Sequence, residues 1–175
     1  MNEQPAVALL RDYLRRAHEW MEGTLVDVTP DIAHSLPPGK PNPIGAQYAH
    51  VLTAEDMFVN VLICGGQGLM ATTFAGKTGM SLPQPLSREW DDWARQVRID
   101  LPAIRTYAQA LYASTDATLA AMTDADLERE LDLTRIGMGT TTVGKLLGNV
   151  LINTLQHCGE ISCLKGLHGQ KGYSA

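Results

Sequence analysis

Two histidines in separate segments have the chemistry and the placement expected of metal ligands. His50 and His157 each lie on or beside an apolar stripe with a period near 3.6, which predicts that both face the interior of a helical protein. Imidazole is a common ligand for transition metals, and helical bundles often hold metals between facing helices. The pair therefore favours a metal site, and the alternative for each is a hydrogen-bonded core histidine. We expect His18 at the edge of the core, and His34 and His168 in solvent.

Asn153 precedes His157 by four residues, so the two side chains are neighbours on one helix face. A His-x-x-x-His pair at this spacing binds a metal between two imidazoles. This chain has Asn-Thr-Leu-Gln-His instead. An amide oxygen is a neutral and harder ligand than imidazole, so we expect Asn153 to hold Zn²⁺ or Ni²⁺ more weakly than a histidine would.

Other polar and aromatic residues near these positions have less specific roles. Glu160 follows His157 by three residues and is expected either to accept a hydrogen bond from a ligand histidine or to be solvated. Cys158 points about 100° away from His157 around the helix, so it is not an obvious ligand. Trp90 and Trp93 lie on an apolar stripe, which predicts core or interface positions rather than substrate stacking.

Apolar residues recur at three- and four-residue steps along four long segments. These stripes cover residues 7–25, 44–62, 90–122 and 146–164. Pro102 removes a backbone donor within the third stripe, so we expect a kink there or a restarted helix with Asp100 as its cap. The four stripes predict one all-α domain over residues 1–175, an up-down four-helix bundle with long inter-helix loops.

Shorter signals lie between these segments. Residues 65–87 are rich in glycine and proline and are expected to form an irregular loop. Thr123 and Asp126 have the spacing of a variant capping box for a short helix. Residues 135–142 hold glycines and threonines and predict a turn or a short hairpin, after which Thr141 or Thr142 would cap the last helix.

Composition excludes several classes of function. The chain has 175 residues and a net charge of −5, from 14 Lys and Arg against 19 Asp and Glu, without a basic cluster for a nucleic-acid backbone. Its longest apolar run, residues 58–64, is far shorter than the roughly 20 residues of a membrane-spanning helix. The first residues are polar, unlike a signal peptide, and the three cysteines are an odd count that favours a reducing compartment. We therefore predict a cytoplasmic protein that contacts neither nucleic acid nor membrane.

Two segments partly match the phosphate-binding loop G-x-x-x-x-G-K-[ST]. Residues 139–145 match its first seven positions, but Leu146 stands where a hydroxyl would hold Mg²⁺. Residues 71–78 end in Gly-Lys-Thr but begin with alanine. Neither segment lies in a strand–loop–helix pattern, so nucleotide binding is the least favoured interpretation. We expect a flexible loop at Gly76 and a helix N-terminus at Thr141 instead.

A family resemblance becomes specific in the last helical segment. The sequence NTLQHCGEISCLKGLHGQKGY resembles the last helix of the DinB-like family, which typically reads His-x-x-x-His-x-Gly-Glu-Ile-x-x-Leu-x-Gly-Leu-x-Gly-x-x-Gly. The residues that match this pattern are His157, Gly159, Glu160, Ile161, Leu164, Gly166, Leu167, Gly169 and Gly172. The segment PIGAQYAHVLTAEDMFVN resembles the family's second helix, with His50 at the ligand position.

The resemblance implies a DinB-like four-helix bundle that forms a homodimer and holds a divalent transition metal, Zn²⁺ or Ni²⁺. The implied ligands are His50, Asn153 and His157. The implied activity is metal-dependent transfer of a low-molecular-weight thiol to a small-molecule substrate. The first ligand of the last helix is His in most members and Glu in the mycothiol-dependent isomerase branch, so Asn153 departs from the family pattern. We therefore expect a weakened metal site.

Asn153 also motivates an alternative function. A bundle that has lost its metal would bind a small molecule in the cleft between helices, or would serve as a dimeric structural module. Fold resemblance does not decide between an enzyme and such a protein. The sequence assigns no catalytic residue and no thiol-binding residue.

Overall fold

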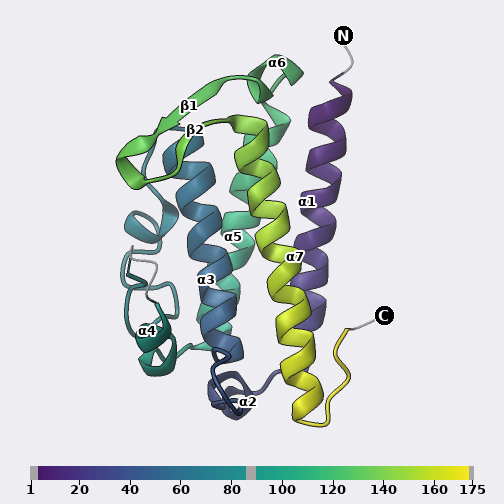
Figure 1. The fold of residues 1–175 in the computed structure, drawn as a ribbon, viewed down its shortest axis with the longest axis vertical. Helices are drawn as coiled ribbons and strands as arrows, with labels where there is room; N and C mark the ends of the chain where they lie inside the picture. Colours follow the sequence, from purple (N-terminus) through teal and green to yellow (C-terminus); the bar gives the residue numbers. More distant parts are fainter. Residues whose placement is uncertain (1–3, 86–89, 174–175) are drawn as a thin grey trace.

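Four long helices form the bundle in the computed structural model, which describes residues 4–85 and 90–173 (Figure 1). They are α1 (Pro5–Thr24), α3 (Ile44–Asp56), α5 (Leu101–Ala120) and α7 (Val143–Leu167), and α3 continues as the π-helical segment η1 (Met57–Ile63). The shorter elements are α2 (Pro30–His34), η2 (Leu69–Ala71), α4 (Asp91–Gln96), α6 (Asp124–Leu127), β1 (Glu130–Leu133), η3 (Thr134–Ile136) and β2 (Gly139–Thr142). The predicted helical class is confirmed.

The long helices do not alternate strictly in direction. In Figure 1, α1 and α7 run downward, whereas α3 and α5 run upward. The reason is the connection over residues 64–100, which carries the chain from the upper end of α3 back to the lower end of the bundle, where α5 begins. The expected up-down order therefore holds from α1 to α3 and from α5 to α7, but not from α3 to α5.

Side-chain caps begin several helices where the sequence predicts. Asp100 caps the N-terminus of α5, so the chain restarts as a new helix before Pro102 instead of kinking. Thr142 caps α7, and Thr123 with Asp126 forms the predicted capping box of α6. The Thr142 cap thereby sets the starting point of α7, the helix that carries Asn153 and His157.

The predicted hairpin exists and begins earlier than expected. β1 and β2 pair antiparallel, with Glu130 opposite Thr142 and Leu133 opposite Gly139. Gly137 adopts a left-handed conformation (φ 75°) at the turn. The hairpin lies over the upper end of the bundle and leads directly into α7 (Figure 1).

Some local predictions differ from the structure. The short helix α2 was not among the predicted helices, and Pro30 is its first residue, a position that suits proline. His34 is not solvated as predicted, since its Nε2 accepts a hydrogen bond from the backbone N–H of Ile99 at 2.8 Å. Pro5 is the first residue of α1, a position that suits proline. Asn2, whose residue type suits an N-cap, lies outside the described residues.

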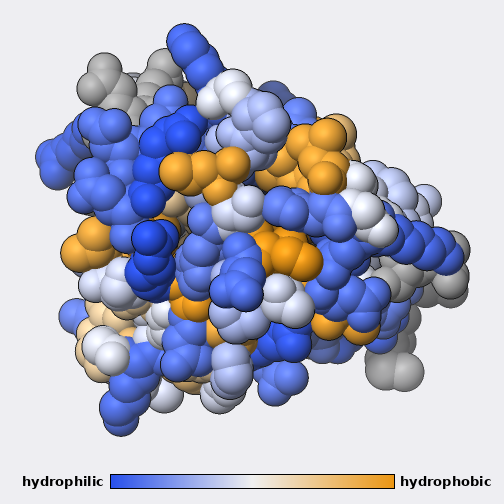
Figure 2. All heavy atoms as spheres, turned by 90° about the horizontal axis from the view of Figure 1, so that it is seen from below, coloured by the Kyte–Doolittle hydropathy of each residue, from blue (hydrophilic) through white to orange (hydrophobic). Residues whose placement is uncertain are grey.

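The lower end of the bundle, seen from below in Figure 2, is mostly hydrophilic with separate apolar patches. Exposed apolar side chains at this end include Val26 and Leu36. Beneath this surface, the fully buried Lys165 donates from Nζ to the carbonyl oxygen of Thr24 at 2.7 Å. A cation near the last carbonyls of a helix is favourable, so this contact ties α7 to the C-terminal end of α1.

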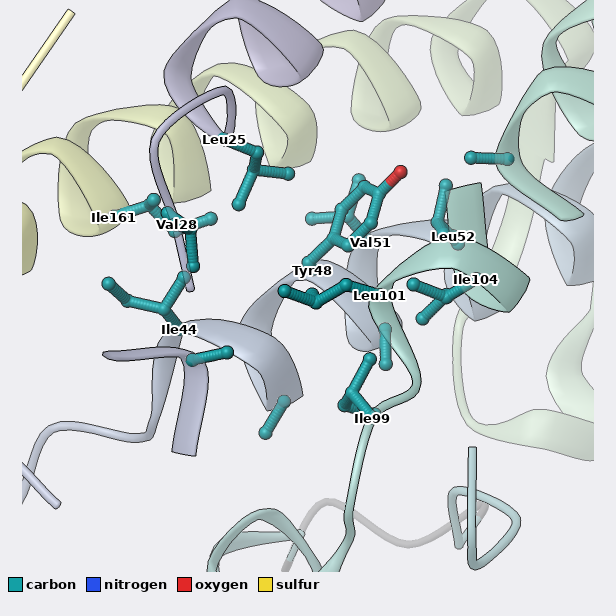
Figure 3. Packing of buried hydrophobic residues seen from close by; sticks show 14 of the residues in the cluster. Leu25, Val28, Ile44, Tyr48, Val51, Leu52, Ile99, Leu101, Ile104 and Ile161 are labelled. Carbon is teal, nitrogen blue, oxygen red and sulfur yellow. The ribbon is translucent and has the colours of Figure 1, made fainter. Parts of the chain in front are cut away.

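The buried apolar residues form two clusters along the bundle. The lower cluster joins the C-terminal ends of α1 and α7 to the first turns of α3 and α5. The residues labelled in its close view (Figure 3) are Leu25, Val28, Ile44, Tyr48, Val51, Leu52, Ile99, Leu101, Ile104 and Ile161. The upper cluster joins η1 and the hairpin to the first turns of α1 and α7.

A layer of buried polar residues lies between the two clusters. His18, Glu55 and Thr115 each lie between the residues that their helices contribute to the lower and upper clusters. Glu55 accepts from the Thr115 hydroxyl at 2.6 Å, and its other oxygen lies 2.9 Å from His18 Nε2. A buried carboxylate is costly unless its oxygens are hydrogen-bonded, so this layer fixes how α1, α3 and α5 align. His18, which we expected at the edge of the core, is thus buried.

Candidate metal centre

The two predicted ligand histidines lie next to each other in the structure. His50 on α3 and His157 on α7 have ring centres 5.1 Å apart, with the rings edge to face at 76°. Two imidazoles bound to one tetrahedral metal at a Zn–N distance of about 2.0–2.1 Å place their ring centres roughly 5 Å apart. The separation of the pair therefore suits a shared metal ion.

Hydrogen bonds determine which nitrogen of His157 carries the proton. Nδ1 lies 2.7 Å from Glu160 Oε2 and 3.3 Å from Gln47 Oε1. The Gln47 side chain is oriented because its Nε2 donates to the carbonyl of Asn42 at 2.8 Å. Both neighbours of Nδ1 are acceptors, so Nδ1 carries a proton and Nε2 is the nitrogen available to a metal. Glu160 is the hydrogen-bond acceptor that the sequence suggested.

His50 is held by an indole and an amide from the connection between α3 and α5. Its ring stacks on Trp90 with a centroid distance of 4.5 Å and an interplanar angle of 9°. Its Nδ1 lies 2.8 Å from Gln84 Nε2. Burial, and secondarily the nearby His157, lowers the pKa of His50 to about 4, so the ring is neutral at neutral pH. The neutral imidazole is the form that binds metals.

Asn153 lies on α7 one turn before His157 and is half-buried. Within the residues that the structure describes, the Asn153 amide makes no hydrogen bond, so no such contact competes with a metal for its oxygen. No three His, Cys, Asp or Glu side chains of the described residues gather into a metal-binding group. A metal between α3 and α7 would therefore depend on two imidazoles and this amide.

A hollow of about 400 Å³ opens beside His157. Its walls are Pro41, Asn42, Gln47, Trp90, His157, Glu160, Cys163 and Leu164. Most of its lining is apolar, with the Glu160 carboxylate and two amides at its edge, which is typical of a small-molecule site. His157 therefore belongs both to the histidine pair and to the wall of the hollow.

The comparison with known protein families identifies the fold. The family model of the DinB superfamily matches residues 13–161. The chain belongs to the DinB superfamily. A conserved protein from Enterococcus faecalis has a similar solved structure, with TM-score 0.76 and 20% identity over 90% of this chain and 93% of that one. A DinB-like protein from Bacillus subtilis has TM-score 0.65 and 17% identity over 95% and 96%. No curated protein matches this chain.

Membership in the DinB superfamily accounts for the fold. The solved structures are only 17–20% identical to this chain, so their similarity does not assign an activity to it. The structure also addresses the nucleotide-binding alternative. Residues 139–145 form strand β2 and the first turn of α7. A phosphate-binding loop follows a parallel strand, whereas β2 is one strand of an antiparallel hairpin. No helix of the described residues is long and apolar enough to cross a membrane.

Sequence reasoning missed part of the site of this DinB-superfamily chain. No sequence pattern could have identified Gln84, because its position beside His50 depends on the path of a long loop. Trp90 packs against the lower apolar cluster, as expected of a core residue, and the sequence did not show that it also covers His50 and borders the hollow. Gln47 did leave a signal, since it is a polar residue on the apolar stripe that also contains Tyr48 and Val51.

Proposed function

We propose that this DinB-superfamily protein binds a divalent transition metal, Zn²⁺ or Ni²⁺, between α3 and α7. His50 and His157 would be its imidazole ligands, with Asn153 as a weaker third ligand. The edge-to-face pair of His50 and His157 carries this proposal, because its separation suits two ligands of one metal. The Glu160 contact adds support, since metal-binding histidines usually donate their other N–H to a carboxylate or carbonyl.

The proposed activity is transfer of a low-molecular-weight thiol to a small-molecule substrate. A metal held by three protein ligands would keep a coordination position open and would lower the pKa of a thiol bound there. Trp90 and Leu164 would bind the apolar part of the substrate in the hollow beside His157. Glu160 would keep the His157 proton on Nδ1 and so preserve its Nε2 lone pair.

Metal analysis of the purified protein tests this proposal. We expect wild type to bind Zn²⁺ or Ni²⁺ weakly and Asn153→His to bind it at least about tenfold more tightly, because imidazole replaces a neutral amide oxygen. Asn149→His is the matched control, since Asn149 is exposed one turn earlier on α7 and should leave affinity unchanged. His50→Ala should abolish binding in both backgrounds.

Two results would overturn the metal proposal. One is that neither wild type nor Asn153→His binds metal at micromolar free concentration. The other is that His50→Ala retains the affinity of wild type, which would remove α3 from the site. Circular dichroism of each variant separates loss of metal from loss of fold.

The alternative function is a metal-free bundle that binds a small molecule in the hollow. Asn153 and the lack of a third strong ligand among the described residues favour it. This alternative predicts ligand binding that survives chelator treatment and is weakened by Trp90→Ala. Thiol transfer predicts instead that the chelator removes activity while Trp90→Ala mainly raises KM.

We also propose that the protein is a homodimer, and that α1 contributes to the interface. Leu9, Tyr13 and Trp20 are 57%, 48% and 58% exposed. At about 100° per residue these three side chains fall on one face of α1, within roughly 40° of each other. These exposed apolar side chains on an outer helix share their face with the exposed Arg16, and a second copy of the chain would cover them.

A further inference from the structure

The hollow beside His157 has two amides and a carboxylate in its walls. The amides belong to Asn42 and Gln47, and the carboxylate belongs to Glu160. A carboxylate offers only acceptor atoms to a ligand, whereas a carboxamide has a donor end and an acceptor end. The kind of ligand that suits the hollow therefore depends on which way the two amides point.

Hydrogen bonds to the protein fix the orientation of both amides. Gln47 Nε2 donates to the backbone carbonyl of Asn42 at 2.8 Å. Asn42 Nδ2 donates to a carboxylate oxygen of Asp91 at 3.0 Å. A carbonyl oxygen and a carboxylate oxygen are acceptors, so the end of each amide that faces them is the nitrogen. The opposite end of each amide is its oxygen.

Both amide oxygens have acceptor capacity left. Among the described residues, Asn42 Oδ1 is buried without a hydrogen-bond partner, which is uncommon for a polar atom. Gln47 is only 3% exposed, and its Oε1 makes a long contact of 3.3 Å with His157 Nδ1. Glu160 Oε2 lies 2.7 Å from the same nitrogen. The Gln47 and Glu160 oxygens therefore converge on one side of the hollow.

The remaining walls and the charge of this region narrow the class of ligand. Pro41, Trp90 and Leu164 supply apolar surface, and Glu160 supplies a negative charge. Asp91 places a second carboxylate behind the Asn42 amide. An ammonium group carries a positive charge and three N–H donors, and it has no acceptor. It therefore complements both the converging oxygens and the charge of the described walls.

We propose that the hollow binds the ammonium group of a primary amine, whose apolar body lies against Trp90 and Leu164. This inference rests on the proposed binding of a small-molecule substrate in the hollow, and it does not require the metal. Glu160 would pair with the positive charge, and Gln47 Oε1 would accept one of the N–H bonds. A ligand carboxylate would instead be repelled by Glu160 and would face amide oxygens that cannot donate to it.

Three probes with the same phenyl ring and different polar ends test this proposal. They are phenethylamine, phenethyl alcohol and hydrocinnamate, which present a cation, a hydroxyl and a carboxylate. Calorimetric titration uses the purified, chelator-treated protein, so that no probe can bind through a metal. We expect the amine to bind at least about tenfold more tightly than the alcohol, because charge-assisted hydrogen bonds are roughly twice as strong as neutral ones. Hydrocinnamate should bind most weakly.

Two variants separate the charge from the apolar contact. Glu160→Gln should weaken phenethylamine binding by about tenfold and leave phenethyl alcohol binding nearly unchanged, because only the amine loses a charge-assisted bond. Glu19→Gln is the matched control, since it removes the same charge from an exposed position on α1 outside these walls and should keep the wild-type preference. Trp90→Ala should weaken amine and alcohol by the same factor, because the two share the phenyl ring.

The proposal is overturned if phenethyl alcohol or hydrocinnamate binds as tightly as phenethylamine, or if Glu160→Gln keeps the wild-type preference. The hollow would then remain a small-molecule site for another class of ligand. It is also overturned if no probe binds at millimolar concentration, which would remove the hollow as the substrate site. Zn²⁺ titration of the same preparations tests the metal separately. A preference for the amine without metal binding would leave this inference in place and exclude metal-dependent thiol transfer.

Discussion

Glu160 shows how one side chain can matter to the proposed metal site although 57% of it is exposed. Its carboxylate accepts the Nδ1 proton of His157, whose own side chain is only 12% exposed. We expect Glu160→Gln to weaken Zn²⁺ binding by about tenfold, because a neutral amide oxygen is a poorer acceptor and makes the imidazole a less basic ligand. Competitive Zn²⁺ titration with a chelating dye measures this change.

The control for this prediction is Glu19→Gln, which removes one negative charge from an exposed position on α1. Equal losses in Glu160→Gln and Glu19→Gln would show that net charge, and not the contact with His157, sets the affinity. Wild-type affinity in Glu160→Gln would show that the hydrogen bond has no effect on the metal.

Cys158 is adjacent to His157 in sequence but differs from the other two cysteines in reactivity. It is 1% exposed, and burial raises its thiol pKa to about 11, whereas Cys64 and Cys163 are exposed. A raised thiol pKa favours the neutral form, so at pH 8 only about one thousandth of Cys158 is thiolate, the nucleophilic form. We expect iodoacetamide to label Cys64 and Cys163 in the native protein and Cys158 only after unfolding. Mass spectrometry of labelled peptides checks this, and rapid native labelling of Cys158 would contradict it.

The residues of the site differ in how far the sequence predicts them. His50, His157 and Glu160 could be found because helical periodicity determines which residues share a face, and each helix is a local structure. Gln84 and Trp90 could not be placed in the same way, because loop geometry brings them to His50. The pairing of His50 with His157 needed the packing of α3 against α7, which the apolar stripes on both helices made predictable.

At the scale of elements, the buried carboxylate of Asp56 ties the long connection to the bundle. It accepts from the backbone N–H groups of Leu69 and Met70 at 2.9 and 2.8 Å, and from the Tyr107 hydroxyl at 2.8 Å. These contacts hold η2 against α3 and α5. The connection that carries Gln84 thus starts from a fixed point, which is why a loop residue can be held against His50.

Further along, the same connection packs closely against the first turn of α5. Gly79 has φ +83°, and a Cβ there would lie 2.6 Å from the backbone nitrogen of Ile104. We expect Gly79→Ala to lower the free energy of unfolding by more than about 2 kcal/mol, because the clash involves backbone and the left-handed conformation is strained. Urea unfolding followed by circular dichroism measures the loss.

Gly76→Ala is the matched control in the same connection. Gly76 has φ +70° but open space around its Cβ position, so it carries the conformational strain without the clash. We expect a loss of only about 1 kcal/mol. Similar losses in the two variants would mean that the loop moves away from α5 to accommodate the new methyl group.

The positions of the helices followed from the sequence more readily than their directions. Stripe periodicity and caps such as Asp100 and Thr142 are local, so they predicted where α5 and α7 begin. The parallel run of α3 and α5 depends on the path of residues 64–100, and a connection that long permits either direction. The helix α2 has only five residues, too few to show a periodic stripe, so the sequence did not predict it.

At the scale of the whole molecule, the net charge is −5, and the lower surface is mostly hydrophilic with separate apolar patches (Figure 2). The exposed Leu9, Tyr13 and Trp20 lie on α1, a helix that also packs against α7 and α5. The residues that face inward from α1, such as Leu14 and Met21, are fully buried, so its outer apolar residues are additional to those the monomer needs. These outer residues are the ones that the proposed dimer would bury.

We therefore expect the wild-type protein to sediment as a dimer at micromolar concentration. Leu9→Glu should raise the dissociation constant of this dimer at least tenfold. Burying a leucine side chain contributes roughly 1.5–3 kcal/mol, and a two-fold interface would lose that contribution twice while bringing two carboxylates together. Leu36→Glu is the control, because Leu36 is also 57% exposed but lies beyond α2, away from the face of α1. A wild-type monomer, or equal dimer affinity in Leu9→Glu and Leu36→Glu, would exclude α1 as the interface. A dimer lost only in Leu9→Glu would place the contact on the outer face of α1, on a different helix from either histidine of the proposed metal site.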